Sequence, residues 1–182
     1  MRPEALQRAL IRAVAFGDTA DEQHLRRQLR GIAHVGAADY LRATTLVCLA
    51  HRFGEPAPPG GAEADRVDPP DRPAFGHLVH RGLLDRERPA PAIGDDELGR
   101  FMAELRAAGP LLRPPRNFLE VEAVIRGLYG EPHMLEEIGA KQQHEALAFL
   151  LRYLTDSIPE IRECFEAVID QAQALQRFWI IG

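Results

Sequence analysis

Apolar residues recur along most of this chain at spacings of three and four, the spacing that places side chains on one face of an α-helix. No segment alternates apolar and polar residues as a half-buried strand does. The pattern therefore predicts an all-α fold, a helical bundle of about seven to eight helices with no sheet.

The first third of the chain is expected to form three helices, over about 3–16, 20–32 and 37–53. The motif Thr19-x-x-Glu22 is typical of a capping box, in which two side chains bond the free N–H groups at a helix start, and it opens the second helix. The middle of the third helix is almost wholly apolar, so this helix is predicted to lie at the centre of the front part.

Residues 54–73 contain six prolines and three glycines and cannot form a helix. We interpret them as a long loop or linker between an N-terminal three-helix unit, 1–53, and a C-terminal helical bundle, 74–182. One domain overall is the alternative. Short helices are expected to follow at about 74–86 and 95–108.

Helix signals are clearest in the last third of the chain. Asn117-x-x-Glu120 is a second capping-box pattern and opens a helix that Gly130 ends. A short helix is expected over 132–138, and a longer one from 140 to 154.

The last predicted helix opens with a third capping box, Ser157-x-x-Glu160. Its apolar residues repeat at alternating spacings of four and three, which indicates a helix pair within the chain or across a dimer. The apolar C-terminus needs a cover from its own core, another copy or a partner. The predicted interface residues are Ile161, Phe165, Val168, Leu175, Phe178, Trp179, Ile180 and Ile181.

Composition and charge change this picture only in part. The 182 residues carry a net charge of −5. Residues 1–53 hold eight arginines against five acids, whereas residues 117–182 hold five basic side chains against eleven acids. The basic front and the acidic back are expected to attract each other, within the fold or between copies.

No run of about 18 apolar residues and no signal-peptide pattern occurs, so we expect a cytoplasmic protein without a membrane segment.

The side chains that most catalytic sites need are scarce. The chain has one serine and one asparagine, Ser157 and Asn117, and both are predicted helix caps. No nucleophile elbow, Walker loop or dinucleotide-binding glycine motif is present. Hydrolases and nucleotide-binding enzymes are therefore disfavoured.

Two pairs have the spacing of a reactive or metal-binding site. Cys48-x-x-His51 places a thiol and an imidazole one helical turn apart, but in an apolar helix where a buried cysteine is the simpler interpretation. His77-x-x-His80 lacks further residues spaced to complete a zinc site. We predict neither a metal nor a cofactor.

Polar residues gather around His144, with Glu136 and Glu137 near it in sequence, so that acid–base or di-metal chemistry is one hypothesis. His144 falls on the apolar seam of its helix. A core or interface histidine is therefore favoured, and it is the residue expected to be pH-sensitive.

Three arginines on the polar side of the second helix, Arg26, Arg27 and Arg30, form a possible anion-binding face. Neither register of a helix-turn-helix over residues 21–50 fits, because in each register one arginine and one glycine fall at positions that need a different type of residue. Nucleic-acid binding is therefore disfavoured.

Together these observations favour a non-catalytic helical interaction module: an adaptor, chaperone-like or regulatory protein that acts through protein–protein contacts and forms a homodimer. The first alternative is a ligand- or DNA-responsive regulator that uses the arginine face. The second is a helical enzyme, either with Cys48 and His51 or with Glu136, Glu137 and His144.

Overall fold

The computed structural model describes residues 3–29, 36–53, 93–108, 112 and 114–181, with the side chains of 178–181 left out. These residues form nine helices and no strand, which confirms the all-α prediction. The predicted linker 54–73 and the predicted helix 74–86, with His77 and His80, lie outside the described residues.

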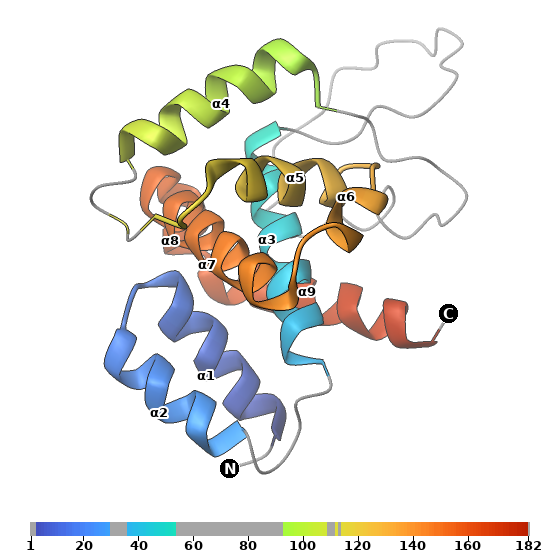
Figure 1. The fold of residues 1–182 in the computed structure, drawn as a ribbon. Coiled ribbons are helices and arrows are strands. Elements are labelled where there is room, and N and C mark those ends of the chain that lie inside the picture. Colours follow the sequence, from blue (N-terminus) through green and yellow to red (C-terminus); the bar gives the residue numbers. More distant parts are fainter. Residues whose placement is uncertain (1–2, 30–35, 54–92, 109–111, 113, 182) are drawn as a thin grey trace, which may run out of the picture.

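The helices follow the chain in the order shown in Figure 1. The long helices match the predicted ones closely, because each carries a continuous apolar face. Their bounds are α1 Pro3–Ala15, α2 Thr19–Leu29, α3 Ala37–Phe53, α4 Asp95–Ala108, α5 Phe118–Leu128, α6 His133–Glu136, α7 Ala140–Ser157, α8 Pro159–Glu163 and α9 Phe165–Ile181.

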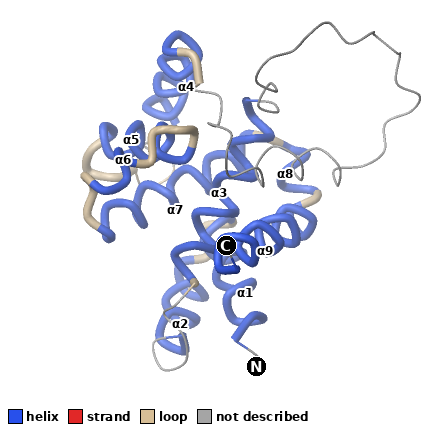
Figure 2. The backbone as a smooth tube through the Cα atoms, turned by 90° about the vertical axis from the view of Figure 1, so that its right-hand side faces the viewer, coloured by secondary structure: helices blue, strands red, loops and turns tan. Residues whose placement is uncertain are grey.

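Helices α3 and α7 form the centre of the molecule. Residues 43–49 of α3 and 146–151 of α7 are buried all round the helix, as expected for helices with neighbours on every side. Helix α3 packs on α7 and α9, α5 packs on α7, and α1 pairs with α2. In Figures 1 and 2, α4 lies at one end of the molecule and the α1–α2 hairpin at the other, with α3 and α7 between them.

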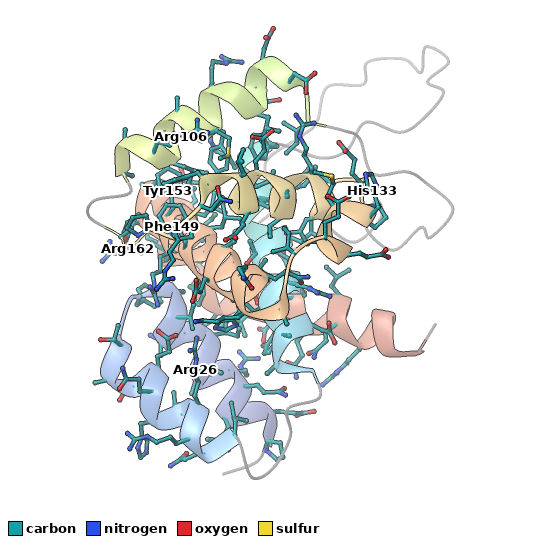
Figure 3. All side chains as sticks on the ribbon, in the orientation of Figure 1. Arg26, Arg106, His133, Phe149, Tyr153 and Arg162 are labelled. Carbon is teal, nitrogen blue, oxygen red and sulfur yellow. The ribbon has the colours of Figure 1, made fainter. Side chains whose placement is uncertain are left out.

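Aromatic edge-to-face contacts join α4 and α5 to the central helices. Phe101 of α4 contacts Phe53 of α3 and Tyr153 of α7, with ring centroids 5.1 and 5.7 Å apart. Phe118 of α5 meets Phe149 of α7 at 5.7 Å. Phe149 and Tyr153 accordingly lie beneath α4 in Figure 3. Such ring pairs add modestly to the burial of their apolar surface.

The helix starts test the three capping-box predictions. Asn117 does cap α5, because its side-chain oxygen accepts a hydrogen bond from the Leu119 N–H at 3.0 Å. Thr19 is not the cap of α2. The Asp18 carboxylate accepts from the Asp21 N–H at 3.0 Å instead. The side chain of Glu22, the predicted partner of Thr19 in the capping box, is buried.

Ser157 is not a cap either. Residues before a proline are pushed out of the helical region, and Ile158, before Pro159, is extended at φ −116° and ψ 101°. Ile158 therefore separates α7 from α8. The sequence predicted a single last helix, but the structure interrupts it at Cys164, between α8 and α9. Ile161 of α8 and Phe165 of α9 both remain in the core.

Glycines with positive φ end two helices. Gly130, at φ 114°, ends α5 as predicted, and the Glu131 N–H closes the turn on the Arg126 carbonyl. Gly17, at φ 71°, ends α1 in the same way, because the Asp18 N–H donates to the Ala13 carbonyl at 2.9 Å.

Gly17 and Gly99 provide a matched test of this account, since a Cβ added at either position meets nothing within 4 Å. Gly17→Ala should lower the free energy of unfolding by about 1 kcal/mol, because alanine resists a positive φ. Gly99→Ala, inside helix α4, should raise it by about 0.5–1 kcal/mol. Urea unfolding measures both changes, and shifts in the same direction would contradict the assignment.

Candidate functional site

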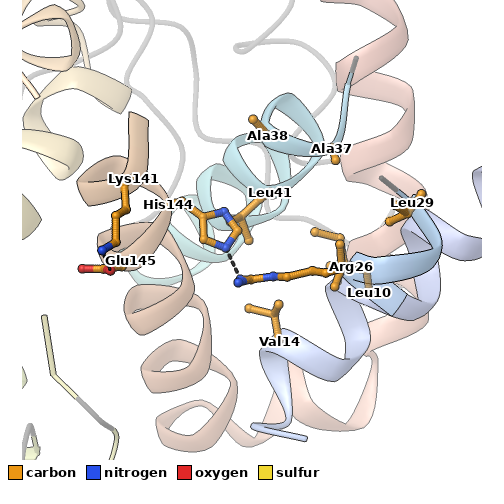
Figure 4. A pocket seen from close by; sticks show the side chains of 11 residues that line it. Leu10, Val14, Arg26, Leu29, Ala37, Ala38, Leu41, Lys141, His144 and Glu145 are labelled. Carbon is orange, nitrogen blue, oxygen red and sulfur yellow. Dashed lines mark hydrogen bonds and ion pairs between the residues drawn. The ribbon is translucent and has the colours of Figure 1, made fainter. Parts of the chain in front are cut away.

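A pocket of about 600 Å³ opens between the α1–α2 hairpin and the first turns of α3 and α7 (Figure 4). Its size is that of a site for a small organic ligand. The residues that line it are Leu10, Ile11, Val14, Arg26, Leu29, Ala37, Ala38, Leu41, Lys141, His144 and Glu145.

Most of the pocket wall is aliphatic. Helix α1 contributes a leucine, an isoleucine and a valine from its core-facing side, and α2 contributes Leu29. Helix α3 begins with Ala37 and Ala38, whose short side chains fill little of the space beside Leu41. An apolar cavity with a few polar groups at one side is the usual form of a small-molecule site.

Arg26 of α2 and His144 of α7 meet at one side of the pocket (Figure 4). Figure 3 shows Arg26 at the α1–α2 hairpin. Its Nη2 donates to Nε2 of His144 and also pairs with Oε1 of Glu22 at 2.5 Å. Among the described residues, Nε and Nη1 of Arg26 have no hydrogen-bond acceptor, so these donors are open to a ligand.

A buried carboxylate holds Arg26 in this position. Glu22 is only 7% exposed, and its Oε2 accepts from Nη2 of Arg152 at 2.8 Å. Nε of Arg152 donates to the Val14 carbonyl in the last turn of α1, at 2.9 Å. Arg152 of α7 therefore ties both helices of the hairpin to the centre of the bundle, and Glu22 is shared between two guanidinium groups.

The surroundings of His144 favour its neutral form. Burial lowers its pKa below the ordinary value, and the nearby Arg26 charge lowers it further, against the opposing effect of Glu22. A neutral imidazole whose Nε2 accepts from Arg26 carries its proton on Nδ1. At the pocket rim, the Lys141 ammonium lies 3.8 Å from the Glu145 carboxylate.

Of the three arginines predicted as one anion-binding face, Arg26 and Arg27 are described, and their side chains lie in different surroundings. Arg26 lies in the pocket, whereas Arg27 is exposed and donates to the Gln23 carbonyl of its own helix. Arg30 lies outside the described residues. The sequence could identify the charged face but not which of its members turns inward, because that depends on Glu22 and α7.

The predicted attraction between the basic front and the acidic back occurs within the chain. Arg8 contacts Asp170 at 2.5 Å and Glu166 at 3.1 Å, and Arg12 contacts Glu166 at 2.5 Å. These pairs hold α1 beside α9. Each is exposed and contributes little by itself.

The predicted interface residues on the last two helices divide into two groups. Ile161, Phe165, Val168 and Leu175 are at most 4% exposed and pack in the core of this chain, where α9 lies on α3. In this structure they offer no surface to another subunit. The side chains of Phe178, Trp179, Ile180 and Ile181 are outside the described part, so the homodimer and the protein partner remain predictions.

The two catalytic hypotheses find no assembled site among the described residues. Cys48 is fully buried, which raises the pKa of its thiol, while His51 is exposed. Glu136, at the end of α6, and Glu137, directly after it, are exposed, and His144 faces Arg26 instead. Lys141 pairs with Glu145 of its own helix. No group of three potential metal ligands occurs within the described ranges.

No local pattern in the sequence predicts the pocket as a whole. Its wall combines residues from four helices, and most of them were predicted only as parts of apolar faces. Two sequence features bear on the pocket: the pair of alanines that begins α3 and the carboxylate of Glu22 on α2.

Comparison with known protein families, with functionally characterised proteins and with solved structures gives no match to this chain. None of the described helices is both long and apolar enough to cross a bilayer. The geometry of the pocket is therefore the basis for a functional proposal.

The buried ion pair can be tested against the exposed one on the same helix. Arg152→Met removes the donor to the Val14 carbonyl and one of the two partners of a buried carboxylate, and should cost about 3 kcal/mol of unfolding free energy. Lys141→Met removes an exposed pair and should cost less than about 1 kcal/mol. Urea unfolding of both variants measures the difference. Equal costs would contradict the anchoring role of Arg152.

The lowered pKa of His144 predicts a pH-dependent stability. The unfolded chain takes up a proton on this side chain near pH 6.5, while the folded chain takes it up only at lower pH. The stabilisation is therefore present above about pH 6.5 and is lost as the pH falls through the folded-state pKa. His144→Gln should lose less stability than the wild type between pH 7.5 and 5.5. An NMR titration of His144 with an ordinary midpoint would contradict the prediction.

Proposed function

We propose that this protein is a ligand-responsive regulatory module that binds a small, largely apolar molecule between the α1–α2 hairpin and the centre of the bundle. The observation that supports the proposal most directly is the pocket of about 600 Å³, with aliphatic walls and the Arg26–His144 pair at one side. This develops the regulator alternative from the sequence, with one inward arginine in place of an arginine face.

The burial of several potential nucleophiles favours binding over catalysis. The hydroxyls of Thr44, Thr45 and Thr155 are buried and donate to carbonyls one turn earlier in their own helices. The thiol of Cys48 is buried away from the pocket. These groups hold the helices together and are not available to a substrate.

The position of the pocket favours a regulatory role. Its ligand would contact α1 and α2 on one side and α3 and α7 on the other, so occupancy would bear directly on how the hairpin packs. A ligand changes a conformational equilibrium only through different contacts in the two states. A site that lies across the hairpin boundary provides such contacts.

Filling the pocket tests the proposal. Ala38 lines it from an exposed helix position, so Ala38→Trp should occupy the cavity without disturbing the core. Ala103→Trp on α4, exposed and outside the pocket lining, is the control. Thermal unfolding is measured with a library of small apolar compounds carrying neutral, anionic and cationic groups. A compound at about 100 times its Kd adds about 2.7 kcal/mol to stability.

We expect at least one of the three classes of compound, neutral, anionic or cationic, to raise the Tm of the wild type and of Ala103→Trp. The same compounds should not raise the Tm of Ala38→Trp. Equal shifts in all three proteins would place binding elsewhere. A library without any stabilising compound would contradict the proposed function.

A further inference from the structure

The polar side of the pocket narrows the ligand to one chemical class, and this inference rests on the proposed function. We propose that the pocket binds an apolar monocarboxylate, whose carboxylate replaces His144 as the acceptor on Nη2 of Arg26 and is then bound by both side chains. The aliphatic walls receive the rest of the molecule.

The charge around the site favours an anion. Arg26, Arg152 and Lys141 are cationic, while Glu22 and Glu145 are anionic, so these neighbours have an excess of one positive charge. A monoanion would neutralise this excess in a partly buried setting, where charges interact more strongly than in water. A cationic ligand would add to the excess.

The donors of Arg26 favour a carboxylate among the monoanions. Nη2 is engaged by Glu22 and His144, whereas Nε and Nη1 have no acceptor among the described residues. If the ligand replaced His144 as the acceptor, an N–H of Nη2 would be available to it together with an N–H of Nε or Nη1. Two parallel N–H donors match the two oxygens of a carboxylate.

His144 completes the site as a second donor. In the empty pocket its imidazole is kept neutral mainly by burial. A carboxylate placed beside it would favour the protonated ring, which donates from both nitrogens. Binding would then take up a proton, so the affinity would rise as the pH falls.

The charged groups that face His144 come from two helices. Helix α2 contributes Arg26 and Glu22, and α7 contributes Glu145 and Arg152 as neighbours in the helix that carries it. Lys141 lies at the same pocket wall. The lining residues from α1 and α3 are all aliphatic, so no carboxylate from those helices competes with the ligand.

The experiment uses matched ligand pairs. Octanoate, decanoate and phenylbutyrate are each compared with the alcohol of the same skeleton by titration calorimetry on the full chain. The wild type should bind at least one carboxylate about tenfold or more tightly than its alcohol, a difference of about 1.4 kcal/mol. Arg26→Met should remove this preference, so that the carboxylate and its alcohol bind with similar affinity. Arg27→Met, on the exposed side of the same helix, should retain it.

The pH dependence gives a second readout, between pH 7.5 and 5.5, where the ligand stays mostly ionised. Wild-type affinity for the carboxylate should increase severalfold towards pH 5.5, and His144→Gln should show a flat profile. Folding of each variant is checked by circular dichroism and by urea unfolding.

Two results would overturn this inference while leaving the proposed function intact. One is equal affinity for carboxylates and alcohols in the wild type, and the other is a carboxylate preference that survives Arg26→Met. Carboxylate binding that persists in Ala38→Trp would overturn both proposals, because the ligand would then lie outside the pocket.

Discussion

The buried carboxylate of Glu22 determines how the two parts of the site meet. It pairs with Arg152, which reaches across from α7 and also bonds the last turn of α1. The same carboxylate pairs with Arg26 one turn further along α2. A buried ion pair gains little net stability, because desolvation offsets the attraction. Its effect is on geometry. A position of the α1–α2 hairpin that separated Glu22 from Arg152 would leave the buried Glu22 carboxylate without that partner.

The apolar contacts have the complementary role. The all-round burial of α3 and α7 provides the hydrophobic stabilisation, but aliphatic packing alone is not directional. The polar contacts restrict the positions that this packing allows. At the pocket, Arg26 and His144 occupy the interface between hairpin and bundle, and the alanines of α3 lie opposite. Full closure would bury the open Arg26 donors without acceptors, which is costly.

The sequence predicted the helices well because their signal is local. Spacings of three and four residues fixed nearly every long helix, and Asn117 and Gly130 were assigned correctly from their neighbours alone. The errors occurred where two local signals competed. Asp18 and Thr19 can both cap α2, and the structure uses Asp18. The capping motif at Ser157 conflicts with Pro159, whose steric effect on the preceding residue dominates.

The pocket could not be predicted in this way, since residues as far apart in sequence as Leu10 and Glu145 line it. The same difficulty applies to charge. Arg8 and Arg12 lie on the other helix of the hairpin that carries Arg26, yet their carboxylate partners come from α9. Arg26 finds its carboxylate on its own helix and an imidazole opposite, and it lines a largely aliphatic pocket. An acidic chain can therefore contain a site suited to an anion, because the local pairing of charges, and not their sum, sets the field at the pocket.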